Sequence, residues 1–416
     1  MKRDVLFIIN PIAGVRPKDE IPDLIHEVFG ASEDFNLDIR FTEYAGHASL
    51  LSKEAVSRKV DTVVAIGGDG TINEVGRGLV GSDVKFGIVP MGSGNGLARH
   101  MQLPLNLSNA LECIKEGHYE AVDYGTINDH IFFCTAGIGI DAKVSAKFAE
   151  SSKRGPISYL RSFMELLNDY QPSTYVIYTD DGRVKERAFL IAIGNASQWG
   201  NNAFITPHAS MQDGLLDITL VKPVPMIEIP RMAMQLFTRR LDTNPHVLSF
   251  RSEHIRIIMP HADVVHVDGE PVMMDGVLDI RTHAAQLNVI LPLHPTNVVQ
   301  ETIQFAFEDI HYSMQDNLKR GLTALEELNK PVIKAAENTV ATMTKAAETT
   351  VSNVAKVAET TVSSMSKAAE TTVSTMTKAA ETTRNTMTKA AESVVKVADN
   401  IVAGNNLFRK KSDSAE

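Results

Sequence analysis

The densest group of chemically informative residues is Gly67-Gly-Asp-Gly-Thr71, followed by Ile72-Asn73-Glu74. Its three glycines allow backbone angles closed to other residues and let a ligand approach the main chain. The preceding run, Thr62–Ile66, is β-branched and apolar, as in a buried strand. Thr71 and Glu74 have capping-box spacing, which predicts a helix from Thr71. A strand, a glycine turn and a helix N-terminus together form an anion site, above all for phosphate.

Asp69 lies in the middle of this predicted anion site. A carboxylate there would repel phosphate unless a metal ion or a proton transfer gives it a role. The simpler alternative is a tight turn with a solvated aspartate. Because three glycines, an aspartate and a helix cap occur together, we favour the ligand-binding interpretation.

The segments around this turn alternate between predicted strands and helices. Strands are expected at residues 5–9, 37–42, 62–66 and 85–90, and helices at residues 19–29 and 48–59 and from residue 97. The alternation predicts an α/β domain with a mainly parallel sheet, in which ligands bind beyond the carboxyl ends of the strands. Three loops should meet there: Asn10–Gly14, Gly67–Asn73 and Gly92–Asn95.

After about residue 122 short alternating strands predominate, interrupted by predicted helices at residues 157–169 and 225–240. The strands are expected at residues 125–127, 130–135, 173–179, 188–195, 215–221, 254–259, 264–267, 277–281 and 286–291. This pattern predicts a β-rich second domain, a sandwich. The cleft between two such domains is the default ligand site. The histidines of this half show no metal-ligand spacing, and we interpret them as ordinary surface or core residues. They include His246, His254, His261, His266 and His283.

The C-terminal part of the chain differs from both predicted domains. Residues 302–328 place apolar side chains at helical spacing, which predicts an amphipathic helix that ends near Pro331. Its apolar side would dock on the globular part or on a membrane. From Lys334 the sequence repeats every 11 residues, so a helix of these repeats would present one narrow apolar stripe.

The repeats are rich in threonine, a mediocre helix former. We therefore expect the tail to be helical only where another surface covers its apolar stripe. A lipid surface is one cover, and a partner helix in a right-handed coiled coil, as in a homodimer, is the other. The pattern is similar to the 11-residue repeats of proteins that coat lipid or polymer surfaces, which favours lipid. A solvated spacer is the remaining alternative.

Composition and charge exclude several classes of protein. The formal net charge of −10 argues against nucleic acid as a partner, since that binding needs clustered Lys and Arg. Cys113 and Cys134 are the only cysteines and fit a reducing compartment. No apolar run has the length of a signal-peptide core or a spanning helix. We therefore expect a cytoplasmic protein, soluble or peripherally membrane-associated.

Several motifs, taken as a set, resemble the catalytic region of the diacylglycerol kinase and sphingosine kinase family. In the first half they are Asn10–Gly14, Gly67–Thr71 with Asn73 and Glu74, and Pro90–Ala98. In the second half Gly137–Ala142, Pro207–Asp217 and Val267–Pro271 follow in the expected order. The resemblance covers about residues 1–294 and leaves the repeat tail outside. No glycine turn matches a Walker A loop or the full dinucleotide fingerprint.

This resemblance implies ATP-dependent phosphorylation of a lipid hydroxyl, with Mg²⁺, between an α/β and a β domain. The nucleotide-binding positions that it carries over are Asn10, Pro11, Ile12, Ala13, Gly14, Thr42, Gly67, Gly68, Asp69, Gly70, Thr71, Ile72, Asn73 and Ser93. The catalytic segment corresponds to Asp268 and Glu270, and a structural metal site to Asp213 with the Leu215 carbonyl. Ser210 stands where bacterial members supply a further metal ligand, a departure that puts this metal in doubt.

The chemistry of phosphoryl transfer agrees with this assignment. Such transfer is mostly positioning and charge neutralisation, which glycine-loop amides and a carboxylate near Mg²⁺ supply; Asp69 is assigned to that side. A second carboxylate must take the proton from the attacking hydroxyl, and we assign this role to Asp268, with Glu270 second. From the residues alone, Asp268-Gly-Glu270 is more readily explained as a hairpin turn, since Asp-Gly is a common turn pair.

The sequence as a whole predicts five segments. They are a nucleotide-binding α/β domain (1–124), a β-rich lipid-substrate domain (125–294), an amphipathic helix (295–331), the repeat tail (332–403) and a disordered end (404–416). The leading hypothesis is a kinase that phosphorylates diacylglycerol or a sphingoid-type lipid at a membrane surface. A soluble NAD-kinase-like phosphotransferase and a non-catalytic lipid-surface coat or scaffold are the alternatives. The Gly92-Ser-Gly-Asn turn is closer to the sphingosine-kinase form.

Overall fold

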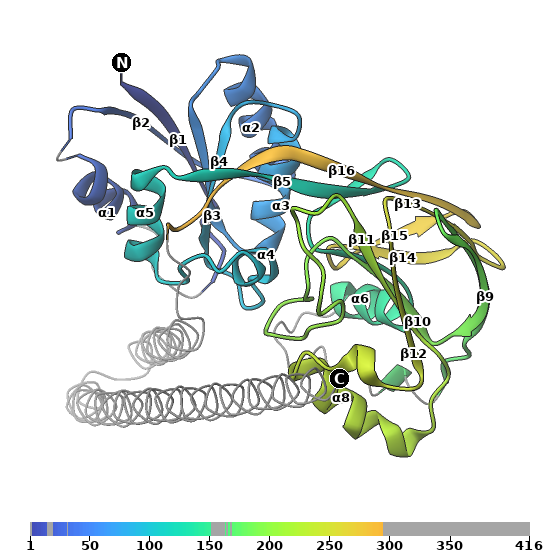
Figure 1. Cartoon of the computed structure of the whole chain (residues 1–416). Coiled ribbons are helices and arrows are strands. Elements are labelled where there is room, and N and C mark those ends of the chain that lie inside the picture. Colours follow the sequence, from blue (N-terminus) through green and yellow to red (C-terminus); the bar gives the residue numbers. More distant parts are fainter. Residues whose placement is uncertain are drawn as a thin grey trace, which may run out of the picture. The chain divides into compact units, whose positions relative to one another are not determined.

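A computed structural model describes residues 2–14, 20–30, 32–150, 163, 165–166 and 169–293 of the chain. The predicted amphipathic helix, the repeat tail and the polar end lie outside these residues, as does most of the helix expected at 157–169. Two sheets organise the described residues into two lobes (Figure 1).

The N-terminal lobe, called the α/β lobe below, has four parallel strands with helices on both faces. Its strands are β1 (Arg3–Ile9), β2 (Phe35–Phe41), β3 (Thr62–Gly67) and β4 (Lys85–Pro90), in the order β2-β1-β3-β4. Its helices are α1 (Ile21–Phe29), α2 (His47–Ser57), α3 (Asp69–Leu79), α4 (Gly96–His100) and α5 (Leu107–Glu116). The parallel α/β architecture predicted from the sequence is confirmed.

Alternate side chains of β1 show why both faces of this sheet are covered. Phe7 and Ile9 pack with α1 and α5 on one face, whereas Leu6 and Ile8 pack with α2 and α3 on the other. A strand that is apolar on both faces is buried between two helical layers. The carboxyl ends of these parallel strands therefore lie at one edge, where the loops that lead into the helices meet.

The longest strand, β16 (Val277–Ile290), joins the two lobes. Near its end it pairs in parallel with β4, and near its beginning it pairs antiparallel with β13 (His254–Ile258). β5 (Tyr119–Ile127) also runs antiparallel to it. One ten-stranded sheet thus extends from the α/β lobe into the second lobe, as Figure 1 shows. The predicted boundary between residues 124 and 125 falls within β5, so the lobes share a sheet.

The second lobe, called the β lobe below, is the predicted sandwich. The shared sheet contributes β6 (His130–Phe132), β8 (Ser173–Thr179) and β9 (Gly182–Ala188) to it. The other sheet has the order β12-β11-β10-β7-β14-β15 and pairs antiparallel throughout. Its strands are β7 (Thr135–Gly139), β10 (Leu190–Gly194), β11 (Leu216–Val221), β12 (Val247–Ser252), β14 (Asp263–Val267) and β15 (Glu270–Met274).

Alternation along β10 places two apolar layers on this second sheet. Ile191 and Ile193 face the interior of the sandwich. Leu190 and Ala192 face the opposite side, where a separate apolar cluster is covered by α6 (Ile140–Glu150) and α8 (Ile229–Phe237). The 3-10 turns η1 (Met226–Glu228) and η2 (Leu241–Thr243) flank α8.

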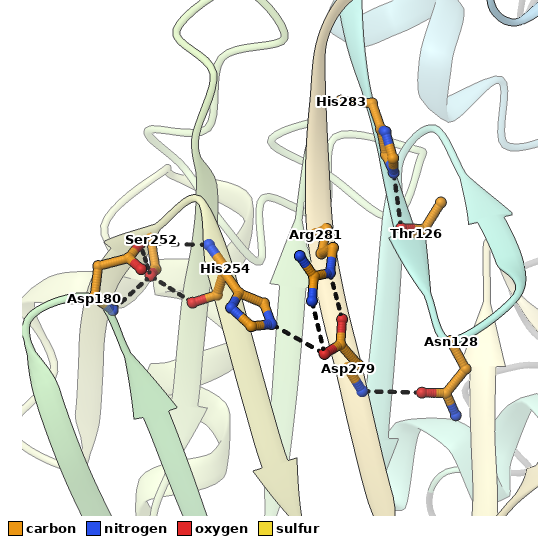
Figure 2. A network of polar contacts seen from close by, with 8 residues as sticks. All are labelled: Thr126, Asn128, Asp180, Ser252, His254, Asp279, Arg281 and His283. Carbon is orange, nitrogen blue, oxygen red and sulfur yellow. Dashed lines mark hydrogen bonds and ion pairs between the residues drawn. The ribbon is translucent and has the colours of Figure 1, made fainter.

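A polar corner ties the two sheets of the sandwich where β12 passes into β13. The Asp180 carboxylate accepts hydrogen bonds from the Ser252 hydroxyl (2.7 Å) and the Glu253 N–H (3.1 Å). On the next strand, His254 Nε2 lies 3.1 Å from the Asp279 carboxylate. Figure 2 shows this network, which extends along the exposed face of the shared sheet. It fixes the β8–β9 turn to the crossing between sheets.

The structure corrects the predicted start of α3. The helix begins at Asp69, and Thr71 and Glu74 do not form a capping box. Thr71 Oγ1 accepts a hydrogen bond from Asn10 Nδ2 (2.9 Å), and Glu74 Oε1 accepts one from Gly46 N (2.9 Å). Both side chains therefore link α3 to other segments, and the spacing alone did not reveal these partners.

Other differences concern elements without a strong sequence period. α5, α6, most of β7, and strands β9, β12 and β15 were not predicted. The two strands expected at residues 277–281 and 286–291 are one strand, β16, whose register shifts between His283 and Leu287. Ala285 takes a left-handed conformation at this shift (φ 53°). The alternation of side chains is interrupted there, and we had interpreted the interruption as a turn between two strands. Among the described residues, no helix is long and apolar enough to cross a membrane.

The corner makes a prediction about acid stability. Hydrogen bonds from Ser252 and then from the His254 N–H hold the pKa of Asp180 below its ordinary value of 3.8. A carboxylate with a lowered pKa in the folded state stabilises the fold above pH 3.8 and loses this effect as the pH falls further. Asp180→Asn should therefore lower Tm at neutral pH, and the difference from the wild type should shrink below about pH 4.

Asp181→Asn is the matched control for this measurement. It removes the same charge from the same turn, and its side chain makes no hydrogen bond or ion pair with any described residue. Its Tm should follow the wild type at each pH. A Tm difference for Asp180→Asn that stays constant down to pH 3 would contradict an ionic contribution of this corner.

Candidate functional site

The first glycine turn connects β3 to α3 at the carboxyl edge of the shared sheet. Gly68 is the N-cap of α3 in an extended conformation, and no side chain caps the helix. The first N–H groups of a helix have no partner within it, and the helix dipole adds positive potential at this end. The start of α3 is thus suited to hold an anion, as predicted from the glycines.

The second glycine turn, after β4, packs directly against the first. A Cβ added to Gly92 would lie only 2.9 Å from the Gly68 Cα and 3.0 Å from Asn95 Oδ1. A Cβ added to Gly67 would lie 2.7 Å from Thr71. Side chains are excluded because the two main chains touch. The glycines therefore allow the second turn to lie directly against the start of α3.

Asp69 holds the second turn in position. Its carboxylate accepts hydrogen bonds from Asn95 N (3.0 Å) and Gly96 N (2.8 Å), at the start of α4. Burial raises the pKa of Asp69, and these N–H groups act against that rise. From the sequence we expected a metal ion or a proton transfer to compensate the charge of Asp69. The structure shows that main-chain N–H groups at the start of α4 also compensate it. Asn95 Nδ2 is buried without a hydrogen-bond partner in the described chain.

The loop after β1 completes this edge of the site. Asn10 donates to Thr71 Oγ1 on α3, and its Oδ1 accepts from Ile12 N (3.0 Å). Gly14 has φ 64°, and a Cβ there would lie 2.4 Å from the Met91 carbonyl oxygen. The loop is thus fixed against both glycine turns by contacts that only Asn and Gly make in this geometry.

The remaining predicted nucleotide-binding residues differ in their solvent exposure. Pro11, Ile12, Gly70 and Ser93 are exposed at the strand ends, and Ala13 and Thr42 are half-buried. Ile72 belongs to the core beneath α3, and the Asn73 side chain is buried (3% exposed). The last two positions therefore shape the turn from within and do not offer their side chains to a ligand.

The predicted catalytic segment is a hairpin turn between β14 and β15. Asp268 and Gly269 both have positive φ (51° and 84°), as the central pair of a type I′ turn requires. The Asp268 carboxylate accepts three main-chain hydrogen bonds, to Oδ2 from Phe133 N (2.8 Å) and to Oδ1 from Cys134 N (2.8 Å) and Thr135 N (3.0 Å). Burial raises the pKa of Asp268 against these N–H groups.

Glu270 lies beside this turn on the exposed rim. Both terminal nitrogens of Arg77 lie 3.3 Å from Glu270 Oε2. The side chain of Glu270 is 53% exposed and that of Arg77 is 27% exposed. Arg77 comes from α3, so this ion pair links the hairpin of the β lobe to the helix whose N-terminus carries the first glycine turn. Arg77 was not among the residues predicted from the sequence.

Cys134 lies where the two halves of the site meet. Its N–H donates to Asp268, and its Sγ lies 3.5 Å from the position of a Cβ on Gly96, the residue whose N–H donates to Asp69. Burial, and then the charges of Asp268 and Asp69, raise the pKa of the thiol. As whole residues, Asp69, Cys134 and Asp268 are half-buried. The second glycine turn and the Asp268 hairpin therefore both contact Cys134.

A buried histidine supports the hairpin from behind. His266 Nε2 lies 3.2 Å from Asp141 Oδ2, and His266 Nδ1 accepts from Gly269 N at 3.4 Å. The tautomer with its proton on Nε2 satisfies both contacts. A Cβ on Gly137 would lie 2.3 Å from both Asp141 Oδ2 and His266 Nε2. His266 is thus a core residue, as interpreted from the sequence, but one that touches the catalytic turn.

The predicted metal site has a different arrangement. Asp213 Oδ2 lies 3.6 Å from Arg251 Nη1, and Arg251 Nε bonds Asp217 Oδ1 at 3.1 Å. Ser210 Oγ accepts from Gln212 N (3.3 Å). A guanidinium therefore provides the positive charge at this carboxylate. The described residues contain no group of three or more His, Cys, Asp or Glu that could hold a metal. A metal on Ser210, Asp213 and the Leu215 carbonyl, which are not a group of that kind, stays a prediction.

Asp123 is a further residue that the sequence analysis missed. Its carboxylate is buried and accepts from Gly214 N and Ala285 N, both at 2.8 Å. It therefore joins the loop of the predicted metal site to the irregular turn of β16. The position of Asp123 inside a strand was the signal that could have identified it. A buried carboxylate nearly always has hydrogen-bond or charge partners, so it marks a place where segments meet.

Comparison with known proteins agrees with this geometry. Residues 4–127 match the model of the diacylglycerol kinase catalytic domain, and residues 134–291 match that of the YegS C-terminal NAD kinase beta sandwich-like domain. A probable lipid kinase YegS-like from Yersinia pestis is 30% identical over 289 residues, which cover 68% of this chain and 95% of that protein. One from Pectobacterium atrosepticum is 29% identical over 261 residues, with 61% and 85% covered.

A solved structure from Bacillus anthracis, a candidate diacylglycerol kinase, is similar along both lobes. Its TM-score is 0.61 at 25% identity, and the match covers 71% of this chain and 97% of that one. The two domain matches, the near-complete cover of the relatives and the shared fold agree with each other. The chain therefore belongs to the YegS-like family of lipid kinases, which is related to the diacylglycerol kinases.

Proposed function

We propose that this chain transfers the γ-phosphate of ATP, with Mg²⁺, to a hydroxyl of a diacylglycerol or sphingoid-type lipid at a membrane surface. The observation that carries the proposal is the meeting of the glycine turns and the Asp268 hairpin at Cys134. Family membership supports ATP as the phosphoryl donor, generally with a divalent metal. When bound, ATP supplies the phosphoryl group and the metal neutralises part of its charge.

The glycine turns fit the phosphates of a nucleotide. They present the first N–H groups of α3, at Gly70, where an added Cβ would meet no atom within 4 Å. In the second turn, the N–H groups of Gly92, Asn95 and Gly96 are held by Asn95 Oδ1 and Asp69, which fixes that turn beside the helix start. The buried Asn95 Nδ2 adds a donor that has no partner in the described chain. Buried donors are nearly always paired, so this one supports a ligand at the turn. Mg²⁺ in such sites is often held by substrate phosphates and few carboxylates.

Asp268 fits the role of the base that takes the proton from the lipid hydroxyl. A carboxylate has about four lone-pair positions, of which three accept N–H groups here, so one on Oδ2 is left. The same bonds hold the carboxylate in one orientation. Burial raises its pKa, and a base of raised pKa accepts a proton more readily near neutral pH.

Arg77 fits the role of steadying negative charge beside the base. It lies within reach of Glu270, and its charge lowers the pKa of Asp268. In phosphoryl transfer an arginine at this kind of position neutralises charge that develops on the transferred group. Glu270 then serves to hold Arg77 at the rim. Because its carboxylate is engaged by this arginine, Glu270 is the second candidate for the base, after Asp268.

The site supports action at a membrane only indirectly, through its lipid acceptor. We extend the proposal to a cytoplasmic enzyme that associates peripherally with membranes, with the 11-residue repeats adding residence on a lipid surface or pairing two chains. The acidic net charge of −10 supports neither RNA nor DNA as a partner.

The first test is transfer of labelled γ-phosphate from ATP by the purified full chain, with Mg²⁺, to a panel of acceptors. Diacylglycerol, a sphingoid base, monoacylglycerol and NAD make up the panel. Label in a lipid acceptor is expected, and it would identify which one. Label in NAD alone would replace the proposal by a soluble phosphotransferase. Binding of ATP without transfer to any acceptor would favour a scaffold protein.

The assignment of the base is tested by comparing Asp268→Asn with Glu270→Gln. Asp268→Asn removes the free lone pair at Oδ2, so kcat should fall by about 10²-fold or more while ATP binding stays unchanged. Glu270→Gln keeps an acceptor for Arg77 and should reduce kcat far less. Steady-state kinetics with separate ATP titrations would measure both.

Stability has to be measured alongside, because Asp268→Asn also removes one acceptor for the Phe133 N–H. Tm should drop, yet both variants should stay folded at the assay temperature. Normal turnover in Asp268→Asn would exclude Asp268 as the base. A larger kcat loss in Glu270→Gln than in Asp268→Asn would move the role to Glu270.

The contact between the glycine turns predicts different effects for two alanine variants. In Gly92→Ala the new Cβ meets the Gly68 main chain, so both Tm and ATP affinity should fall. In Gly70→Ala the Cβ meets no atom within 4 Å, so Tm should hold while ATP affinity falls if the phosphates lie there. Equal Tm losses in both would argue against the contact, and unchanged ATP affinity in both would argue against a nucleotide at this turn.

A further inference from the structure

The segment formed by η1 and α8, residues 226–237, has two apolar sides. Ile229, Met232 and Leu236 pack on the apolar cluster that covers the outer face of the second sheet. On the opposite side, large apolar side chains face solvent: Met226 (57% exposed), Ile227 (83%), Met234 (65%) and Phe237 (57%). A helix of an ordinary globular protein presents only one apolar face, toward the core. The second apolar side needs another explanation.

Basic residues flank this exposed apolar side. Arg231, Arg239 and Arg240 are all exposed. Within the segment, the only acidic side chain is Glu228, which lies 3.8 Å from Arg231. The Arg239 guanidinium lies 4.3 Å from the centre of the Phe204 ring and so stays at the surface above the next loop. The patch is therefore positively charged although the whole chain has a formal net charge of −10.

We propose that residues 226–240 dock on an anionic lipid surface, with the four apolar side chains inserted and the arginines at the headgroups. Helices that lie in a membrane interface combine an apolar face with Arg and Lys at its border. Anionic headgroups match the local charge, whereas the net charge of the chain disfavours docking elsewhere on its surface. The lipid acceptor of this kinase family also resides in such a surface, so this inference rests on the proposed function.

Short connections link this segment to the catalytic site. Phe204 N donates to the carbonyl of Leu236 in α8 (3.0 Å). In the same loop, Asn201 N donates to the carbonyl of Gly94 in the second glycine turn (3.2 Å). One loop thus contacts both the docking segment and the phosphate site. A lipid surface bound at α8 would therefore lie at a fixed distance and orientation from the second glycine turn.

The test places a reporter on the docking segment itself, because the repeat tail of the full chain could bind vesicles on its own. Full-length Met234→Cys carries an environment-sensitive fluorophore, and Leu50→Cys, at an exposed position of α2 (56% exposed), is the labelled control. Vesicles of phosphatidylcholine with phosphatidylserine should raise and blue-shift the emission at residue 234 only. A quencher attached to the lipid acyl chains should then reduce it. No change at residue 234, or an equal change at residue 50, would overturn the proposal.

Matched variants test the two parts of the patch. Met234→Gln with Phe237→Gln, and separately Arg231→Gln with Arg240→Gln, should slow phosphorylation of lipid in anionic vesicles. The loss should be about fivefold per arginine. The same variants should retain full activity on detergent-dispersed lipid. Leu50→Gln with Lys53→Gln makes the same kinds of change on α2 and should have no effect on either.

The outcomes separate this inference from the proposed function. A full chain that phosphorylates dispersed lipid, but whose rate on vesicles ignores both sets of variants, would overturn the docking segment and leave the kinase intact. Insertion at residue 234 in a chain that phosphorylates none of the lipids would support the docking segment and overturn the kinase. Emission changes at residue 234 that depend on protein concentration without vesicles would indicate a second copy as the occupant, and would overturn the lipid surface.

Discussion

Hydrogen bonds from main-chain N–H groups to two carboxylates organise this molecule. Asp69 accepts two such bonds from the second glycine turn, and Asp268 accepts three from the start of β7 and the residues before it. Bonds to an ionised acceptor are roughly twice as strong as neutral ones, so each carboxylate fixes a loop that would otherwise be flexible. Cys134 lies between them. The second glycine turn and the Asp268 hairpin are in place because the two carboxylates hold segments of backbone that meet at this residue.

The parts of the fold that follow a local period could be predicted from the sequence. β3 and the strands beside it are apolar on both faces, which specifies a parallel sheet between helices and a ligand edge at their carboxyl ends. β14 and β15 are joined by Asp-Gly, and the turn has the predicted backbone conformation. The glycine positions of the site followed from the same reasoning, because a close approach of two main chains tolerates no side chain.

What the sequence could not provide are partners that only the fold brings together. Asp69 has the chemistry of a metal ligand, but the N–H groups that donate to it lie 26 and 27 residues away on another turn. Arg77 has no motif of its own, and it becomes informative only beside Glu270, 193 residues later. Asp213 matches a metal ligand by position, yet Arg251 from a different strand supplies its counter-charge. In each case the long-range contact could not be read from the residue type.

The position of β16 has a consequence for how the chain is made. The strand is the last one of the described chain, yet it lies in the middle of the shared sheet, between β4 and β13. The edge of β4 therefore stays unpaired until residue 290 has left the ribosome, although the rest of the α/β lobe is complete about 170 residues earlier. Such a long-range closing step slows folding and exposes a strand edge to aggregation while synthesis continues. The nascent chain thus needs protection at β4, and the shared sheet cannot be completed before the β lobe has been made.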